Sequence, residues 1–93
     1  MTQATPAQPS DTITVTLKLF AVYQETLGEA EKTMVLPVGT TAGEVRDRLI
    51  KAHPTLAQWK ALTRFGINLQ FVEADAVLKE GDELVLIPPV SGG

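Results

Sequence analysis

Residues 41–54, TAGEVRDRLIKAHP, decide the fold because they predict the longest helix in the chain. Thr41 and Glu44 have the spacing of a capping box, in which each side chain accepts a hydrogen bond from a backbone N–H that the helix leaves unpaired. Val45 and Leu49 recur at helical spacing, whereas the charged residues lie mostly off that stripe. One face of this helix is therefore expected to pack on a sheet, and the other to be solvated.

The segments on both sides of this helix predict strands and short helices. Residues 13–20 alternate between apolar and polar side chains, which is typical of a strand with one buried face. Further strands are predicted at residues 31–36, 66–72 and 83–87. Short helical segments are predicted at residues 21–27, before Gly28, and at residues 55–64.

One long helix can cover only one face of such a sheet. The pattern therefore predicts an α+β fold in which a mixed sheet packs on one main helix. Residues 1–11 contain no large apolar side chain after the initiator Met and are expected to be a disordered leader. Residues 12–87 are expected to form the domain, and residues 88–93 an extended C-terminal tail.

Length and composition exclude several classes of protein. A chain of 93 residues supports one packed core, and without cysteine it has neither disulfides nor thiolate metal ligands. The net charge of −3 has the wrong sign for a general nucleic-acid binder. No apolar stretch approaches the ~20 residues of a membrane span, and the N-terminus lacks the features of a signal peptide. The chain is expected to be cytoplasmic.

The sequence contains no pattern typical of an internal catalytic or metal site. Glycine-rich phosphate loops, nucleophile elbows and His-Glu metal helices are all missing. The single histidine, His53, precedes a proline at a helix end, where a solvated or helix-terminal role is expected. The acidic side chains around the last turn are expected to form a solvated face: Glu80, Asp82 and Glu83.

The end of the chain, PPVSGG at residues 88–93, is its most unusual feature. Pro88 and Pro89 have no N–H for a strand ladder, so the last strand should stop at Ile87 and the tail should continue extended. Six extended residues reach roughly 20 Å, enough to enter another protein. Gly92-Gly93 has no side chains and can pass through a narrow tunnel. Ordinary fraying of a terminus is the alternative interpretation.

The last strand also predicts a partner. Residues 84–87 are apolar at consecutive positions, so apolar side chains face both sides of a sheet that one helix layer covers. If Leu84 and Leu86 face the helix, Val85 and Ile87, with Phe71 on a neighbouring strand, form an exposed apolar patch beside the tail. A strand that is buried on both faces is the alternative.

Across residues 13–93 the sequence resembles the small subunits of molybdopterin synthase, a family of ubiquitin-like sulfur carriers with a β-grasp fold. The motifs that support this resemblance are Leu19-Phe20-Ala21 with Glu25 and Gly28, the helix start at 41–49, Ile67-Asn68, Gly81-Asp82-Glu83 and, most specifically, residues 88–93.

The resemblance implies a carrier and not an enzyme that acts alone. An activating enzyme would use ATP to adenylate the carboxylate of Gly93, and a sulfur donor protein would convert it to a thiocarboxylate. The large synthase subunit, in an expected heterotetramer, would receive the tail and pass the sulfur to a cyclic pyranopterin precursor of the molybdenum cofactor. No bound cofactor or metal is implied. The expected partner-interface residues are the apolar patch and the tail that follows it: Phe71, Val85, Ile87, Pro88, Pro89, Val90 and Ser91, with Gly92 beside the reactive Gly93.

Three other functions stay open. The chain could carry sulfur for thiamine or another sulfur pathway, since such carriers share the fold and the terminal Gly-Gly. It could be a protein modifier that joins its C-terminus to lysines. It could also be an interaction module with an inert tail.

Overall fold

The structure, a computed structural model, describes residues 11–89. The predicted leader, apart from Asp11, and residues 90–93 of the predicted tail lie outside the described residues. The elements in chain order are β1 (Thr12–Leu19), α1 (Val22–Leu27), β2 (Glu31–Pro37), α2 (Ala42–Ala52), the 3-10 helix η2 (Pro54–Leu62), β3 (Arg64–Ile67), β4 (Gln70–Val72) and β5 (Glu83–Ile87).

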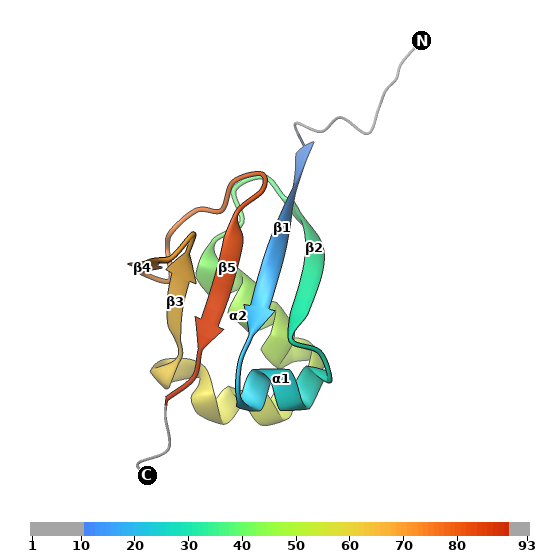
Figure 1. Ribbon diagram of the computed structural model, residues 1–93, viewed down its shortest axis with the longest axis vertical. Coiled ribbons are helices and arrows are strands. Elements are labelled where there is room, and N and C mark those ends of the chain that lie inside the picture. The colour runs from blue at the N-terminus through green and yellow to red at the C-terminus, as the bar shows by residue number, and fades with distance from the viewer. Residues whose placement is uncertain (1–10, 90–93) are drawn as a thin grey trace.

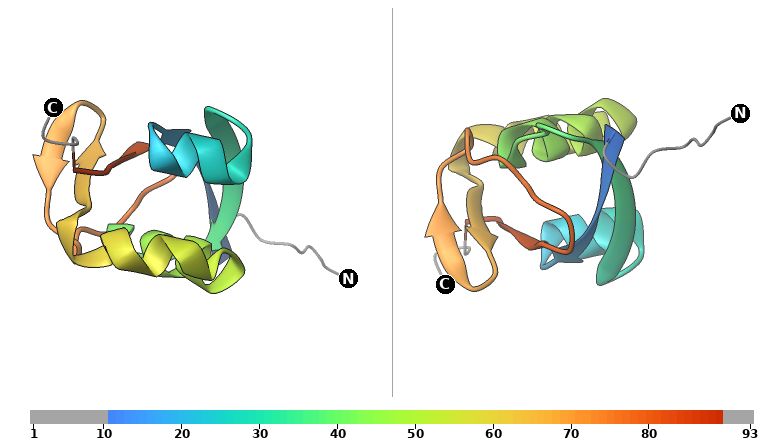
Figure 2. Two further views of the ribbon diagram at one scale, coloured as in Figure 1. Left: turned by 90° about the horizontal axis from the view of Figure 1, so that it is seen from below. Right: turned by 90° about the horizontal axis from the view of Figure 1, so that it is seen from above.

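Five strands form one mixed sheet in the order β2-β1-β5-β3-β4. β1 and β5 are parallel, and every other neighbouring pair is antiparallel. α2 lies behind the sheet in Figure 1, and α1 lies at the lower end of the strands. Figure 2 shows the same arrangement from below and from above. The predicted α+β fold, with a mixed sheet on one main helix, is confirmed.

The core lies between the sheet and α2. Leu17 pairs with Leu84 and Leu19 pairs with Leu86 across the parallel strands, and all four side chains are buried. Val45 and Leu49 of α2 belong to the same cluster. Because successive side chains of a strand point to opposite faces, the residues between them face away from the helix.

The first turn of α2 fixes the helix to the rest of the domain. The predicted capping box is present, since Glu44 N donates to Thr41 Oγ1 at 3.2 Å and Thr41 N donates to Glu44 Oε1 at 2.8 Å. The next two N–H groups donate to carbonyl oxygens of the loop before β5: Ala42 N to Ala76 O and Gly43 N to Ala74 O. The N–H groups that a helix start leaves unpaired thus hold this loop.

Two predictions about the C-terminal third were wrong. Residues 66–72 are not one strand, because Asn68 and Leu69 have φ angles of 50° and 72° and form the two-residue turn between β3 and β4. Asp82 is not part of a solvated face and is only 9% exposed. Its carboxylate accepts hydrogen bonds from Asn68 Nδ2 at 2.9 Å and from Lys79 N at 2.8 Å.

We therefore expect Asp82→Ala to lower the free energy of unfolding by about 1–3 kcal/mol, because it leaves two half-buried donors without an acceptor. Urea denaturation followed by circular dichroism measures this change. Asp75→Ala, at an exposed carboxylate, is the matched control and should change stability by less than about 0.5 kcal/mol. Equal stability of the two variants would contradict a structural role for Asp82.

Candidate functional site

The C-terminal end of β5 is anchored on both sides. Leu86 pairs with Leu19 of β1 and with Phe65 of β3, and Ile87 pairs with Arg64. The ladder ends there because the next two residues, Pro88 and Pro89, have no N–H to donate. After β5 the chain continues at the lower end of the sheet and bends toward the side of β3 (Figure 1).

The two prolines still pack on the domain. Pro88 is buried and Pro89 is half-buried, whereas the sequence predicted that the chain would extend into solvent from Pro88 onward. Both rings lie between two hollows, one lined by Leu62 on η2 and the other by Phe20 beside α1. A proline ends a strand but keeps an apolar ring, which gains from this contact.

A buried chain of hydroxyl groups supports this region. Tyr23 of α1 donates to Thr63 Oγ1, and Thr63 in turn donates to the backbone oxygen of Trp59 on η2 at 2.8 Å. Tyr23 is fully buried and Thr63 nearly so. Because buried hydroxyls need partners, this arrangement fixes α1 against the end of η2 beneath the prolines.

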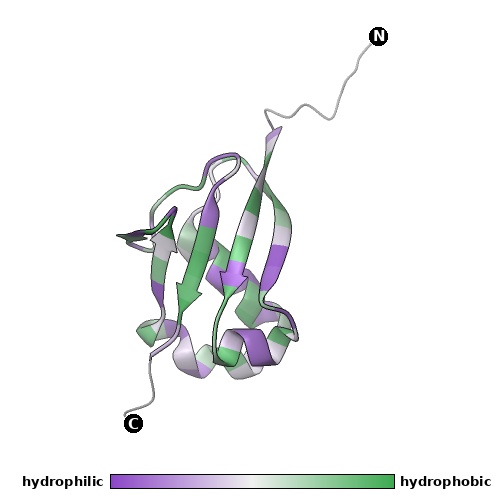
Figure 3. Cartoon of the chain, viewed as in Figure 1, coloured by the Kyte–Doolittle hydropathy of each residue, from purple (hydrophilic) through white to green (hydrophobic). Residues whose placement is uncertain are grey.

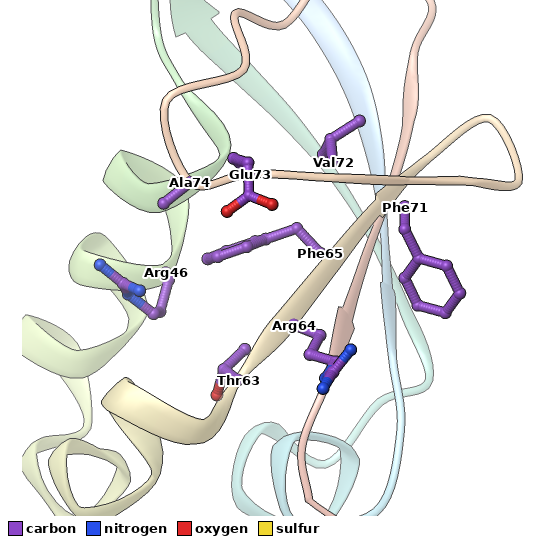
Figure 4. A pocket seen from close by; sticks show the side chains of 8 residues that line it. All are labelled: Arg46, Thr63, Arg64, Phe65, Phe71, Val72, Glu73 and Ala74. Atoms are coloured by element: carbon purple, nitrogen blue, oxygen red, sulfur yellow. The ribbon is translucent and has the colours of Figure 1, made fainter.

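An apolar patch lies on the face of the sheet opposite α2, and its members are Phe20, Leu69, Phe71, Val85 and Ile87. Beyond its hydrophilic first part, β5 has the hydrophobic colour along its length in Figure 3. Figure 4 shows Phe65 directed toward α2, whereas Phe71 points to the other side of the hairpin. Phe71 is 75% exposed and Phe20 is 51% exposed, while Val85 and Ile87 are half-buried. Clustered exposed apolar side chains of this kind mark binding surfaces.

On the β1 side, the apolar patch is bordered by charged side chains. Lys18 is the register partner of Val85 on this face. Its ammonium lies 2.6 Å from a carboxylate oxygen of Glu31 and 3.8 Å from one of Glu83. The hydrogen bond that Lys18 Nζ donates to Glu31, together with the negative charge of Glu31, raises the pKa of Lys18 above its ordinary value. Lys18 therefore stays protonated at neutral pH, and the border is polar.

A further hollow of about 410 Å³ lies between α2 and the β3–β4 hairpin (Figure 4). The guanidinium of Arg46 lies 5.3 Å from the centre of the Phe65 ring, within the range of a cation–π contact. Arg46 Nε also donates to Asp47 Oδ1 at 3.1 Å. These intrachain contacts give Arg46 a structural role at the edge of the core.

Among residues 11–89, no three His, Asp or Glu side chains are grouped closely enough to hold a metal ion. No helix in this part of the chain is long and apolar enough to cross a membrane.

The structure brings three of the predicted interface residues, Phe71, Val85 and Ile87, into one patch and places Pro88 and Pro89 directly after it. The other predicted site residues, Val90, Ser91, Gly92 and Gly93, lie outside the described part of the chain.

Sequence reasoning missed two members of the patch, Phe20 and Leu69. Phe20 is the last residue of the predicted strand and is in phase with Thr14, Thr16 and Lys18, so its position on the uncovered face could have been predicted. Leu69 gave no such signal, because its position depends on the turn.

The sequence comparisons with known proteins agree with one another on the family. The profile of the ThiS family matches residues 17–93. The molybdopterin synthase sulfur carrier subunit of Arabidopsis thaliana is 31% identical over 93 residues, covering 98% of this chain and 97% of the relative. The subunit of the same name from Chlamydomonas reinhardtii is 36% identical over 76 residues, covering 80% of this chain and 92% of the relative.

Solved structures agree in fold. SAMP1, the small archaeal modifier protein 1 of Haloferax volcanii, has a TM-score of 0.71 at 30% identity, covering 86% of this chain and 99% of its own. Caldiarchaeum subterraneum ubiquitin has a TM-score of 0.61 at 18% identity, covering 88% and 99%. Subunits 1 and 2 of the Helicobacter pylori molybdopterin-converting factor were solved as a complex, with a TM-score of 0.57 at 22% identity, covering 87% and 100%. The predicted ubiquitin-like β-grasp fold is confirmed.

The alternation along β5 predicts different effects at neighbouring positions. Leu86→Asp places a charge in the core and should lower stability by ~4 kcal/mol or more, whereas Ile87→Asp, on the uncovered face, should leave the domain folded. Thermal denaturation measures both. A loss of folding in Ile87→Asp as large as that in Leu86→Asp would place Ile87 in the core instead.

Proposed function

We propose, on the premise that this chain belongs to the ThiS family and is a molybdopterin synthase sulfur carrier subunit, that its C-terminal residue Gly93 carries the sulfur. The observation that supports this most directly is the join between β5 and the sequence PPVSGG. A central strand, fixed by a neighbour on each side, leads into a segment that ends in two residues without side chains. Gly93 offers a terminal carboxylate that a partner can approach from any side.

The chemistry proceeds in steps that partner proteins catalyse. An activating enzyme joins the carboxylate of Gly93 to the adenylyl group of ATP and releases pyrophosphate. A sulfur donor protein then supplies sulfur at the oxidation level of sulfide, AMP leaves, and a thiocarboxylate remains. In the large synthase subunit this sulfur passes to a cyclic pyranopterin precursor, and the carboxylate is regenerated. The carrier contributes the reactive terminus and its placement.

We propose that the apolar patch is the surface that docks on the large subunit. Ile87 lines the patch and also both hollows beside the prolines, so a protein that encloses the tail also reaches the patch. The Helicobacter pylori complex of subunits 1 and 2 supports a two-protein assembly. Residues 65–93 contain five acidic residues and one basic residue, so this segment is negatively charged. Its charge suits an electropositive partner surface, and the attraction between the two would steer their association.

A protein modifier is the second candidate function. It is favoured by the similarity to the small archaeal modifier protein 1 of Haloferax volcanii. A modifier joins its C-terminal carboxyl group to lysine amines of other proteins, whereas a carrier exchanges one carboxylate oxygen for sulfur. The intact mass of the chain from cells with active sulfur transfer distinguishes the two, since the carrier alone gains the mass of that exchange.

Deletion of Gly93 should abolish conversion of the pyranopterin precursor by the reconstituted synthase. It should leave the melting temperature unchanged, because the core is formed by residues between Ile13 and Leu86. The measurement is product formation with the large subunit and thiocarboxylated chain. A chain that lacks residues 2–10 is the matched truncation at the other end and should stay active. Normal product formation without Gly93 would refute the proposed carrier function.

A further inference from the structure

Leu69 has a backbone conformation that its side chain disfavours. The β3–β4 turn contains two residues, both with positive φ, as the tight type I′ hairpin turn requires. Asn and Gly are favoured at such positions, and a leucine at a φ of 72° is strained because its Cβ crowds the backbone.

Hydrogen bonds of the residue's own side chain offset the backbone strain at Asn68 but not at Leu69. Asn68 donates from Nδ2 to Asp82 Oδ1 at 2.9 Å, and its Oδ1 accepts from Glu83 N at 3.0 Å. Leu69 is 91% exposed, the largest exposed fraction among the large apolar side chains of the described residues. Packing within residues 11–89 therefore does not account for a leucine at this position. Strain that the fold does not require is characteristic of functional sites.

A hollow of about 270 Å³ lies beside Leu69, with Gly66 at its base. A Cβ at Gly66 would lie 3.6 Å from Gln70 O and 3.9 Å from Val85 Cβ, which are ordinary contacts. The backbone therefore has room for a Cβ there, and glycine is not required at this position although it weakens a strand. The lack of a side chain leaves an opening whose rim includes Leu69 and Phe71.

We infer that Leu69 and the hollow over Gly66 together anchor the large synthase subunit, and that the hollow accepts an apolar side chain from it. This inference rests on the proposed function. Ile87 lines this hollow and also the hollows beside Pro88, so a protein that takes the tail is adjacent to the hollow that Leu69 lines. Gln70 is the only polar side chain among the lining residues, which favours an apolar occupant. Exposed apolar side chains gathered around a hollow are typical of protein interaction sites.

Two variants separate binding from folding. Leu69→Gly removes the apolar side chain and relieves the backbone strain, so the melting temperature should stay the same or rise. Gly66→Val fills the hollow with a side chain that strands favour, so stability should again be maintained. Each variant should raise the Kd for the cognate large subunit by about tenfold or more, as titration calorimetry measures. Val38→Thr, at an exposed valine in the turn after β2, is the control and should bind like wild type.

The outcomes distinguish this inference from the proposed function. Wild-type affinity in both folded variants would overturn the anchor and leave the carrier function intact. Absence of binding by the wild-type chain itself would overturn the proposed assembly and the anchor with it. A dimer of the free chain in sedimentation experiments that Leu69→Gly dissociates would assign the patch to a second copy and would also overturn the inference.

Discussion

The parallel pairing of β1 with β5 is the interaction on which the rest of the structure depends. It joins the first and the last strand of the domain in the centre of the sheet, so every other element lies between them in sequence. Parallel neighbours need a long crossover connection, and here α2 is part of that connection and covers the buried face. Because β3 pairs with the other side of β5, the last strand is held along its length. The C-terminal segment therefore follows a strand that is paired on both sides.

This arrangement gives β5 two roles at alternating positions. Leu84 and Leu86 complete the core, whereas Val85 and Ile87 lie on the uncovered face beside Phe71. A strand in the middle of a sheet is stabilised by two ladders, and it therefore tolerates apolar side chains that stay half-exposed. The Lys18 ion pairs limit the patch on one side, and such charges discourage indiscriminate apolar association. Folding therefore depends on one face of this short segment, and the docking that we propose depends on the other.

Features that depend on neighbours in sequence were predictable. The period-2 pattern of β1 and the Thr41–Glu44 capping box are local, and both were predicted correctly. The single long helix correctly indicated that one face of the sheet is uncovered, and the consecutive apolar residues of β5 placed apolar side chains on that face. The β3–β4 turn was missed because a leucine at its second position hides the usual Asn-Gly signal. Burial of Asp82 was missed because its partner, Asn68, is distant in sequence and is brought near only by the hairpin.

The contrast between Asn68 and Leu69 links these observations. The turn needs two residues with positive φ, and these are Asn68 and Leu69. The side chain of Asn68 is held by hydrogen bonds within the fold, whereas the side chain of Leu69 is exposed. The hydrogen bonds between the Asn68 side chain and both Asp82 and Glu83 hold the hairpin next to the start of β5 and offset the strain at Leu69. The hairpin is thus fixed from within at its first turn residue, which leaves the second free for the partner contact that we propose.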